Sequence, residues 1–174
     1  MIYILGINEH RYQAINPNNN PYEREFHEYV LKQVQTKEIS HLDEEMNDEL
    51  LQSQNGAQES VCRKIAKDLG LTHTMCEPKT LEKQQIGYID KPWEEFLFEA
   101  DSNEKVNAAH FEFLKKQWHI REHFWFEKLR PHSNENVLFV CGAQHPIRLS
   151  KLLRSKGIKN RVICERWKPR NMEG

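Results

Sequence analysis

Residues 137–145 read Val-Leu-Phe-Val-Cys-Gly-Ala-Gln-His, an apolar run that ends at a glycine and is followed by a histidine. A short apolar run of this kind, rich in valine and aromatic residues, is typical of a buried strand. The same arrangement opens the chain, where residues 2–5 lead into Gly6 and then His10. Ligands of open α/β sheets bind at the carboxyl ends of parallel strands. The two strand ends therefore predict a crevice where His10 and His145 converge.

Helix and strand patterns alternate along the rest of the chain. Apolar residues recur at helical spacing in four segments, which begin at Tyr22 or span 61–69, 104–129 and 147–153. Short β-rich runs predict three more strands, at 38–42, 71–76 and 161–164. This alternation predicts an α/β fold with an open, mostly parallel sheet of about five strands and helices on both faces. At 174 residues the chain suits a single domain, 1–174.

Two segments are too polar or too irregular in sequence to predict regular structure. The tract 47–60 is the most polar part of the chain and contains Gln-Ser-Gln-Asn-Gly, which predicts a flexible loop. Residues 166–174 follow the last predicted strand and include Pro169, and they predict an irregular tail. The run 16–21, with two prolines and four asparagines, predicts turns.

Composition indicates a cytoplasmic protein. Charged residues make up 29% of the chain, and no stretch approaches the ~20 apolar residues that a membrane span needs. The first five residues lack the basic segment of a signal peptide. Four cysteines without CxxC spacing predict free thiols rather than a disulfide framework.

The net charge of −1 conceals an uneven distribution. Nine lysines and arginines face two glutamates between His145 and Gly174, which gives this segment a net charge of +7 and leaves −8 for the remainder. Such a segment is typical of a surface that binds phosphate or nucleic acid, and equally of a solvated helix face followed by a tail.

Carboxylates near the same strand ends supply further candidate site residues. Glu9 precedes His10, while Glu44 and Glu45 follow the predicted second strand. Two imidazoles and a carboxylate are a ligand set for a divalent metal. One histidine and one glutamate can instead act as an acid–base pair. The sequence leaves both chemistries open. It also leaves open that the acids only solvate a loop or cap the next helix.

The long predicted helix carries a second pattern, His119-Ile120-Arg121-Glu122-His123, which matches H-x-x-E-H. In zinc proteases with this motif the histidines hold the metal and the glutamate activates water. Those enzymes need a further acidic ligand and are larger chains. In the alternative interpretation Arg121 and Glu122 point toward the crevice, where the arginine would hold a carboxylate or phosphate.

These features together resemble the erythromycin-esterase/ChaN-like and TraB/Tiki group of α/β proteins. The resemblance rests on the first strand with Glu9-His10, on the acids after the second strand, on Arg121-Glu122, and on the Gly-x-x-His motif of residues 142–145. Members of the group are proposed to be metal-dependent or His/Glu-assisted hydrolases. The Tiki branch uses paired Gly-x-x-His motifs with carboxylates to bind divalent metal. The first motif here, Gly-Ile-Asn-Glu-His, is one residue longer than Gly-x-x-His.

The resemblance implies a metal-dependent or His/Glu-assisted hydrolase but carries over no substrate. The crevice residues themselves suit a small-molecule substrate, or one that bears a phosphate or carboxylate, and a divalent metal such as zinc or manganese. The resemblance assigns metal binding to His10, His145 and one of Glu44 or Glu45, a role as ligand or base to Glu9, and a role as anion clamp to Arg121. Glu122, beside Arg121 on the predicted helix, is a further catalytic candidate. The alternative from another class is a non-catalytic module that binds nucleic acid or a nucleotide through the basic C-terminal segment.

Overall fold

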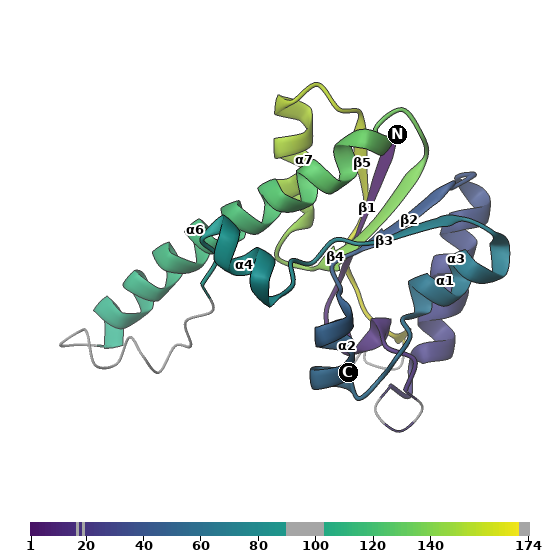
Figure 1. The fold of residues 1–174 in the computed structure, drawn as a ribbon, viewed down its shortest axis with the longest axis horizontal. Helices are drawn as coiled ribbons and strands as arrows, with labels where there is room; N and C mark the ends of the chain where they lie inside the picture. The colour runs from purple at the N-terminus through teal and green to yellow at the C-terminus, as the bar shows by residue number, and fades with distance from the viewer. Residues whose placement is uncertain (17, 19, 90–102, 171–174) are drawn as a thin grey trace.

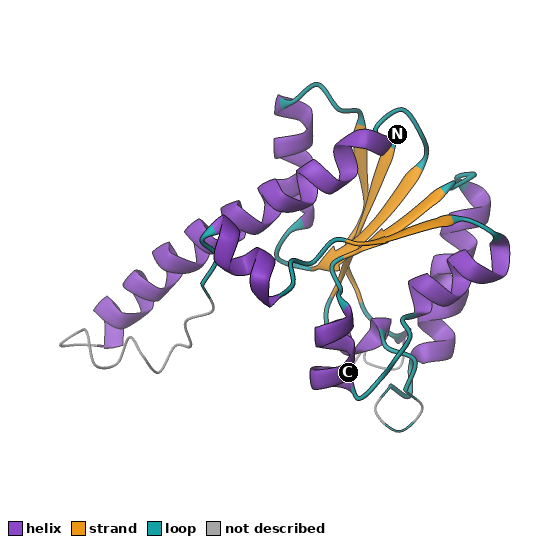
Figure 2. Ribbon diagram, viewed as in Figure 1, coloured by secondary structure: helices purple, strands orange, loops and turns teal. Residues whose placement is uncertain are grey.

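The computed structural model describes residues 1–16, 18, 20–89 and 103–170. Five parallel strands form one sheet in the order β3-β2-β4-β1-β5. The strands are β1 (Ile2–Ile7), β2 (His41–Glu44), β3 (Thr72–Met75), β4 (Val137–Gly142) and β5 (Asn160–Trp167). Figure 2 shows them as one twisted layer between two groups of helices. The prediction of a single α/β domain with an open parallel sheet is confirmed.

Helices cover both faces of the sheet (Figure 1). They are α1 (Glu23–Thr36), α2 (Asp48–Asn55), α3 (Val61–Leu69), α4 (Thr80–Ile86), α6 (Asn103–Leu129) and α7 (Pro146–Ser155), with short 3₁₀ turns η1 (His10–Gln13) and η2 (Arg130–His132). Side chains alternate along β4, so Leu138 packs with α1 and α3 whereas Phe139 packs with α6 and α7. β1 and β4 are therefore buried on both faces, as their apolar sequences predict.

The second strand lies further along the chain than the sequence predicts. It covers His41–Glu44 rather than 38–42, so that Asp43 and Glu44 lie within the strand and are buried. Acidic residues are poor strand formers. Here the backbone pairs with β3 on one side and β4 on the other, and this tertiary pairing outweighs the local preference.

The polar tract 47–60 contains a helix, so the prediction of a flexible loop is wrong for this part. The side chain of Asn47 caps α2 by accepting the N–H of Leu50 at 2.8 Å, and Gly56 ends the helix in the left-handed conformation. Leu51 is the buried contact of the helix. Because a helix with so few apolar residues has almost no periodic signal, only its caps marked it in the sequence.

The last strand is longer than predicted, because β5 continues to Trp167. This side chain is only 7% exposed and packs against the rings of Tyr12, Phe26 and Tyr29. The irregular tail predicted over 166–174 therefore starts after Trp167, and its residues 171–174 lie outside the described part. Within the described residues, every helix is too short or too polar to cross a lipid bilayer.

Candidate functional site

The carboxyl ends of β1, β2 and β4 meet at one edge of the sheet. Glu45 follows β2 directly, and its N–H donates to the carbonyl of Val140 at 2.7 Å. Gly142 ends β4 beside it, where a Cβ atom would lie 3.1 Å from His10 Nε2 and 3.5 Å from Glu45 Oε2. The glycine at this strand end is what allows an imidazole and a carboxylate to approach the backbone this closely.

Glu45 is the centre of the site and is 1% exposed. Its Oε2 accepts the N–H of Gly142 at 2.7 Å, and its Oε1 forms an ion pair with Arg121 Nη2. Burial raises the pKa of Glu45, but Arg121, His10, His145 and the Gly142 N–H together outweigh burial and lower the pKa to about 2. The carboxylate is therefore ionised throughout the physiological range.

The two histidines approach the same oxygen of Glu45. His10 Nε2 lies 3.6 Å from Oε1, and His145 Nε2 lies 4.0 Å from it. The His10 side chain is 44% exposed, whereas that of His145 is 4% exposed. Gln13 holds the imidazole of His10, the more exposed of the two, because its amide nitrogen lies 3.1 Å from His10 Nδ1. The structure thus brings together the two strand-end histidines that the sequence singled out.

His145 is held by a second carboxylate. Its Nδ1 lies 2.9 Å from Glu122 Oε1, and Arg148 Nε lies 3.1 Å from the same oxygen. The rings of Trp125 and Trp118 contact the imidazole edge-on, with centroids at 4.7 and 6.1 Å. A carboxylate at Nδ1 favours the proton on that nitrogen, which leaves Nε2 directed toward Glu45.

Arg121 reaches the site from α6 and binds two carboxylates. Besides Glu45, it donates from Nη2 and Nε to Glu77 Oε2, at 2.8 and 3.2 Å. Burial and the charge of Glu45 raise the pKa of Glu77, against the opposing effect of Arg121. The guanidinium that the resemblance makes an anion clamp is therefore engaged by carboxylates of the chain itself.

A cavity opens beside these groups. Its volume is about 240 Å³, and its lining residues are His10, Glu45, Met46, Leu50, Glu77, Lys83, Tyr88 and Arg121. This volume lies below the range of roughly 300–1,000 Å³ that is usual for drug-sized ligands. The site is therefore sized for a small polar molecule.

The structure does not bring Glu9 and Glu44 to this crevice. Glu9 pairs with Arg11 at 2.6 Å and accepts the hydroxyl of Tyr12 at 3.1 Å. Glu44 points to the opposite face of the sheet, as the alternation along β2 requires, and binds His73 Nε2 at 2.8 Å and the Ser60 hydroxyl. Of the two candidate acids after the second strand, only Glu45 belongs to the site.

The H-x-x-E-H pattern does not form a zinc-protease site. Glu122 is buried and contacts His145 Nδ1 at 2.9 Å, whereas His119 is exposed on α6. The rings of His119 and His123 lie 4.1 Å apart, but the described residues offer no third ligand to this pair. The interpretation in which Arg121 and Glu122 point toward the crevice agrees with the structure.

A divalent metal held by His10, Glu45 and His145 would have to share Glu45 with other donors. One oxygen already binds the positive guanidinium of Arg121 and the other binds a backbone N–H. A cation at this carboxylate would meet the charge of Arg121 at close range. The residues present therefore do not fit a metal in this arrangement, and metal binding in the crevice stays a prediction.

Sequence reasoning missed several contributors to the site, among them Glu77, Gln13 and Lys83. Glu77 follows β3 as Glu45 follows β2, so the signal of an acid at a strand end was present for both. Gln13 and Lys83 carried no comparable signal, because a short 3₁₀ turn brings Gln13 to His10 and a helix outside the predicted elements brings Lys83 to the cavity.

Comparison with protein-family models, with curated proteins and with solved structures finds no match to this chain. The resemblance to the erythromycin-esterase/ChaN-like and TraB/Tiki group therefore rests on the motifs alone and stays a prediction. Nucleic-acid binding by the basic C-terminal segment also stays a prediction. Within that segment Arg148 pairs with Glu122 and Arg170 lies 4.0 Å from Glu25, so part of the positive charge is balanced inside the chain.

Proposed function

We propose that the crevice is the acid–base site of a hydrolase that acts on a small ester, amide or phosphoester substrate. The observation that supports this proposal best is the position of Glu45, a buried carboxylate kept ionised beside the imidazole of His10 at the mouth of a cavity. A carboxylate in this position stabilises the imidazolium that forms when a histidine accepts a proton. A histidine positioned in this way accelerates hydrolysis at neutral pH by general acid–base catalysis.

In the proposed reaction His10 Nε2 takes a proton from an attacking water and returns it to the leaving oxygen or nitrogen. Nε2 must then start unprotonated, with the ring proton on Nδ1. A half-turn of the Gln13 amide would present Oε1 to Nδ1, and Oε1 is buried without a hydrogen-bond partner among the described residues. Glu45 itself is too weak a base for this step, because its pKa is about 2.

His145 and Arg121 are positioning residues in this proposal. Arg121 holds Glu45 in its ionised form, and His145 closes the buried side of the same carboxylate. Glu122 orients the ring of His145 through Nδ1. A substrate carboxylate or phosphate would reach Arg121 by displacing Glu77. Of the two acids that bind Arg121, Glu77 is the one whose pKa is raised, so it becomes protonated and neutral more readily than Glu45.

We propose a cytoplasmic location as well. The four cysteines are free thiols, and three of them are buried in the core. Unpaired thiols that serve as small core side chains are typical of proteins from reducing compartments.

The proposal is tested by assaying a panel of chromogenic carboxylic esters, phosphoesters and peptides against the wild type, His10→Gln and Glu45→Gln. We expect kcat/KM to fall at least about 100-fold in both variants, because one loses the acid–base imidazole and the other loses the carboxylate that stabilises its protonated form. His119→Gln, an exposed histidine on α6, is the matched control and should keep full activity. Equal rates in all four proteins would overturn the proposal. Preincubation with EDTA separates the two chemistries, because a metal-dependent site would lose activity and the proposed site would keep it.

A further inference from the structure

A second group of ligand side chains lies at the opposite edge of the sheet. His41 begins β2, and His132 and Glu135 lie in the segment that leads from α6 into β4. One ligand atom from each of the three lies within 4.8 Å of the other two. Among the described residues this is the one group of three histidine, cysteine or acidic side chains that meets this criterion.

Both histidines of this group lie close to the carboxylate of Glu135. Glu135 Oε2 lies 3.0 Å from His41 Nδ1, and Oε1 lies 4.0 Å from His132 Nδ1. The two imidazole rings lie side by side, with centroids 4.1 Å apart and planes 31° from parallel. Both rings thus present Nδ1 toward the same acid.

The backbone around the group is fixed by the sheet. His41 pairs with Val137 in the register of β2 and β4, so the two segments are adjacent wherever this sheet forms. The carbonyl of Asn136 accepts the N–H groups of Ser40 and His41 at 2.9 and 3.3 Å. The Ser40 hydroxyl donates to Glu135 Oε2 at 3.2 Å, which orients the carboxylate. Hydrogen bonds of this kind hold the carboxylate ligands of metal sites in place.

We propose that His41, His132 and Glu135 bind a divalent transition metal, zinc first of all. Two imidazoles and one carboxylate form an established zinc ligand set, which leaves a fourth position for water. Zinc–ligand bonds of about 2.0–2.2 Å place ligand atoms within roughly 4 Å of one another, so the group must contract slightly. The side chains of His132 and Glu135 are 28% and 47% exposed, and they have the freedom to move inward onto His41, which is buried.

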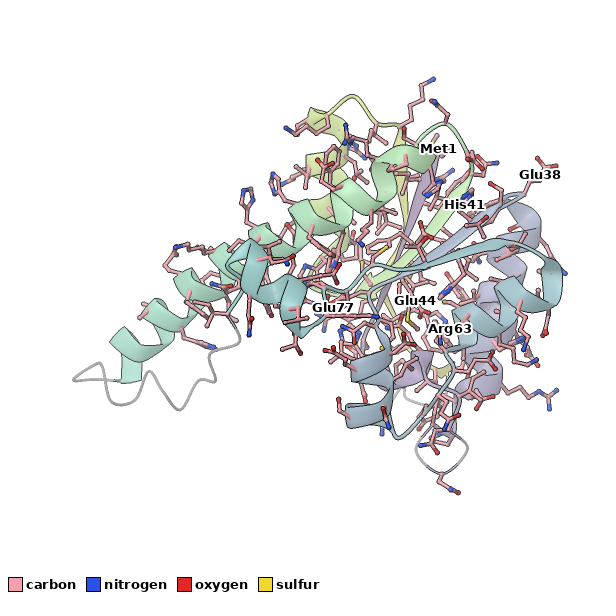
Figure 3. The ribbon with its side chains drawn as sticks, in the orientation of Figure 1. Met1, Glu38, His41, Glu44, Arg63 and Glu77 are labelled. Carbon is pink, nitrogen blue, oxygen red and sulfur yellow. The ribbon has the colours of Figure 1, made fainter. Side chains whose placement is uncertain are left out.

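This site is separate from the crevice. Figure 3 labels His41 and Glu44 at the two ends of β2, and the crevice begins one residue beyond Glu44. Four residues of strand span about 13 Å. The two carboxylates also differ in their partners: among the described residues, imidazoles and a hydroxyl contact the carboxylate of Glu135, whereas a guanidinium binds that of Glu45. A metal ion at Glu135 would therefore meet imidazoles, which can join it as ligands, and not the permanent positive charge of a guanidinium.

The competing interpretation is that two histidines simply share the charge of Glu135 as ion pairs. Titration with zinc alone distinguishes the two. Protein freed of metal with EDTA and dialysed is titrated with ZnCl₂ by isothermal calorimetry near pH 7.5, and the melting temperature is measured with and without zinc. We expect one zinc per chain and a rise in melting temperature. In His132→Gln and Glu135→Gln we expect at least a tenfold loss of affinity and no rise. Both positions are solvent-accessible, so both variants should fold.

Two control variants locate the bound zinc. His123→Gln changes a histidine whose ring lies as close to that of His119 as the rings of His41 and His132 lie to each other, and it should leave the affinity unchanged. Glu45→Gln changes the crevice and should also leave it unchanged. Absence of binding in the wild type overturns the proposal, as does binding that survives His132→Gln and Glu135→Gln or is lost in Glu45→Gln. None of these results depends on hydrolytic activity.

Discussion

The two edges of the sheet carry similar residues in different electrostatic settings. At the carboxyl edge, two histidines approach Glu45, whose charge is fixed by Arg121 and by the N–H of Gly142. At the amino edge, two histidines approach Glu135, whose carboxylate pairs with no arginine or lysine in the described part of the chain. The first carboxylate is bound in an ion pair with an arginine, whereas the second contacts imidazoles and a hydroxyl.

The comparison shows that the residue types alone do not define the chemistry. A guanidinium adds a permanent positive charge that favours an ionised carboxylate and opposes a second cation. A neutral imidazole adds a lone pair, which is what a metal requires. In our two proposals the partner of the carboxylate decides between acid–base chemistry and metal binding, and substitution of that partner is the most direct test of the comparison.

The largest effect is expected from Arg121→Met. This change leaves Glu45 and Glu77 buried without their shared partner, and the loss of one member of a buried ion pair costs about 3–5 kcal/mol. Urea unfolding at pH 7.5 measures the difference. Arg24→Met is the matched control, because the Arg24 side chain is 91% exposed and its pair with Glu28 contributes at most about 0.5 kcal/mol. Similar stabilities for the two variants would show that Glu45 does not depend on Arg121.

The pH dependence of the stability of Arg121→Met tests whether its loss of stability comes from buried carboxylates that lack a partner. The pKa of Glu45 is about 2 in the folded protein, below its ordinary value of 4.5. Its contribution to stability is therefore present above about pH 4.5 and is lost as the pH falls from 4.5 toward 2. In Arg121→Met burial raises the pKa of both acids, which are then protonated under mildly acidic conditions. The stability gap between the variant and the wild type should narrow from pH 7 to pH 4, and a constant gap would contradict this explanation.

Asp43→Asn should give the next largest effect on stability, and here the effect is a gain. Asp43 lies on β2 between the two sites and is fully buried, and burial raises its pKa from 3.8 to about 6. A raised pKa gives stability that is complete below pH 3.8 and is lost as the pH rises through 6. Above pH 7 the ionised carboxylate costs about 3 kcal/mol, since one pKa unit corresponds to about 1.4 kcal/mol.

We therefore expect Asp43→Asn to stabilise the protein by up to about 3 kcal/mol at pH 8 and to change little at pH 4. Chemical unfolding at the two pH values measures this difference. Asp48→Asn is a useful control, because the Asp48 side chain is 57% exposed and should give no such pH-dependent gain. A loss of stability at pH 8 would mean that the ionised Asp43 has a compensating partner and that the middle of β2 belongs to one of the two sites.

The fold could be predicted from the sequence because apolar periodicity determines it. The runs in β1 and β4 are nearly uninterrupted, as strands buried on both faces require, and the glycine and histidine after them mark the edge where His10 and His145 approach Glu45. Glu45 could be chosen as a candidate, but not in preference to Glu44. Which of two consecutive acids faces the crevice depends on strand register, and the sequence placed the second strand about two residues too early.

The amino-edge site had no such signal in the sequence. His41 and Glu135 lie far apart in the chain and become neighbours only because β2 and β4 pair in the sheet. Glu77 illustrates a different difficulty, since it stands at a strand end like Glu45 but shows its role only through Arg121, which reaches both from α6. Periodicity identifies elements, whereas these contacts depend on how the elements pack.

The smallest effect on stability, and the sharpest test of the difference between the two edges, is expected from Gly142→Ala. The new Cβ would lie 3.1 Å from His10 Nε2, tighter than ordinary contact, and the half-exposed His10 ring can yield by moving outward. We expect a loss of at most about 1 kcal/mol, at the low end for overpacking. Hydrolysis should fall at least tenfold because His10 is displaced from Glu45, while zinc affinity at the amino edge stays unchanged. Gly6→Ala differs, because its Cβ would lie 2.0 Å from the backbone oxygen of Glu165 and should disrupt the pairing of β1 with β5. If Gly142→Ala unfolds the protein, as Gly6→Ala should, then Gly142 is needed for the sheet and not for the site. If Gly142→Ala lowers zinc affinity in addition to hydrolysis, then the two edges are not independent.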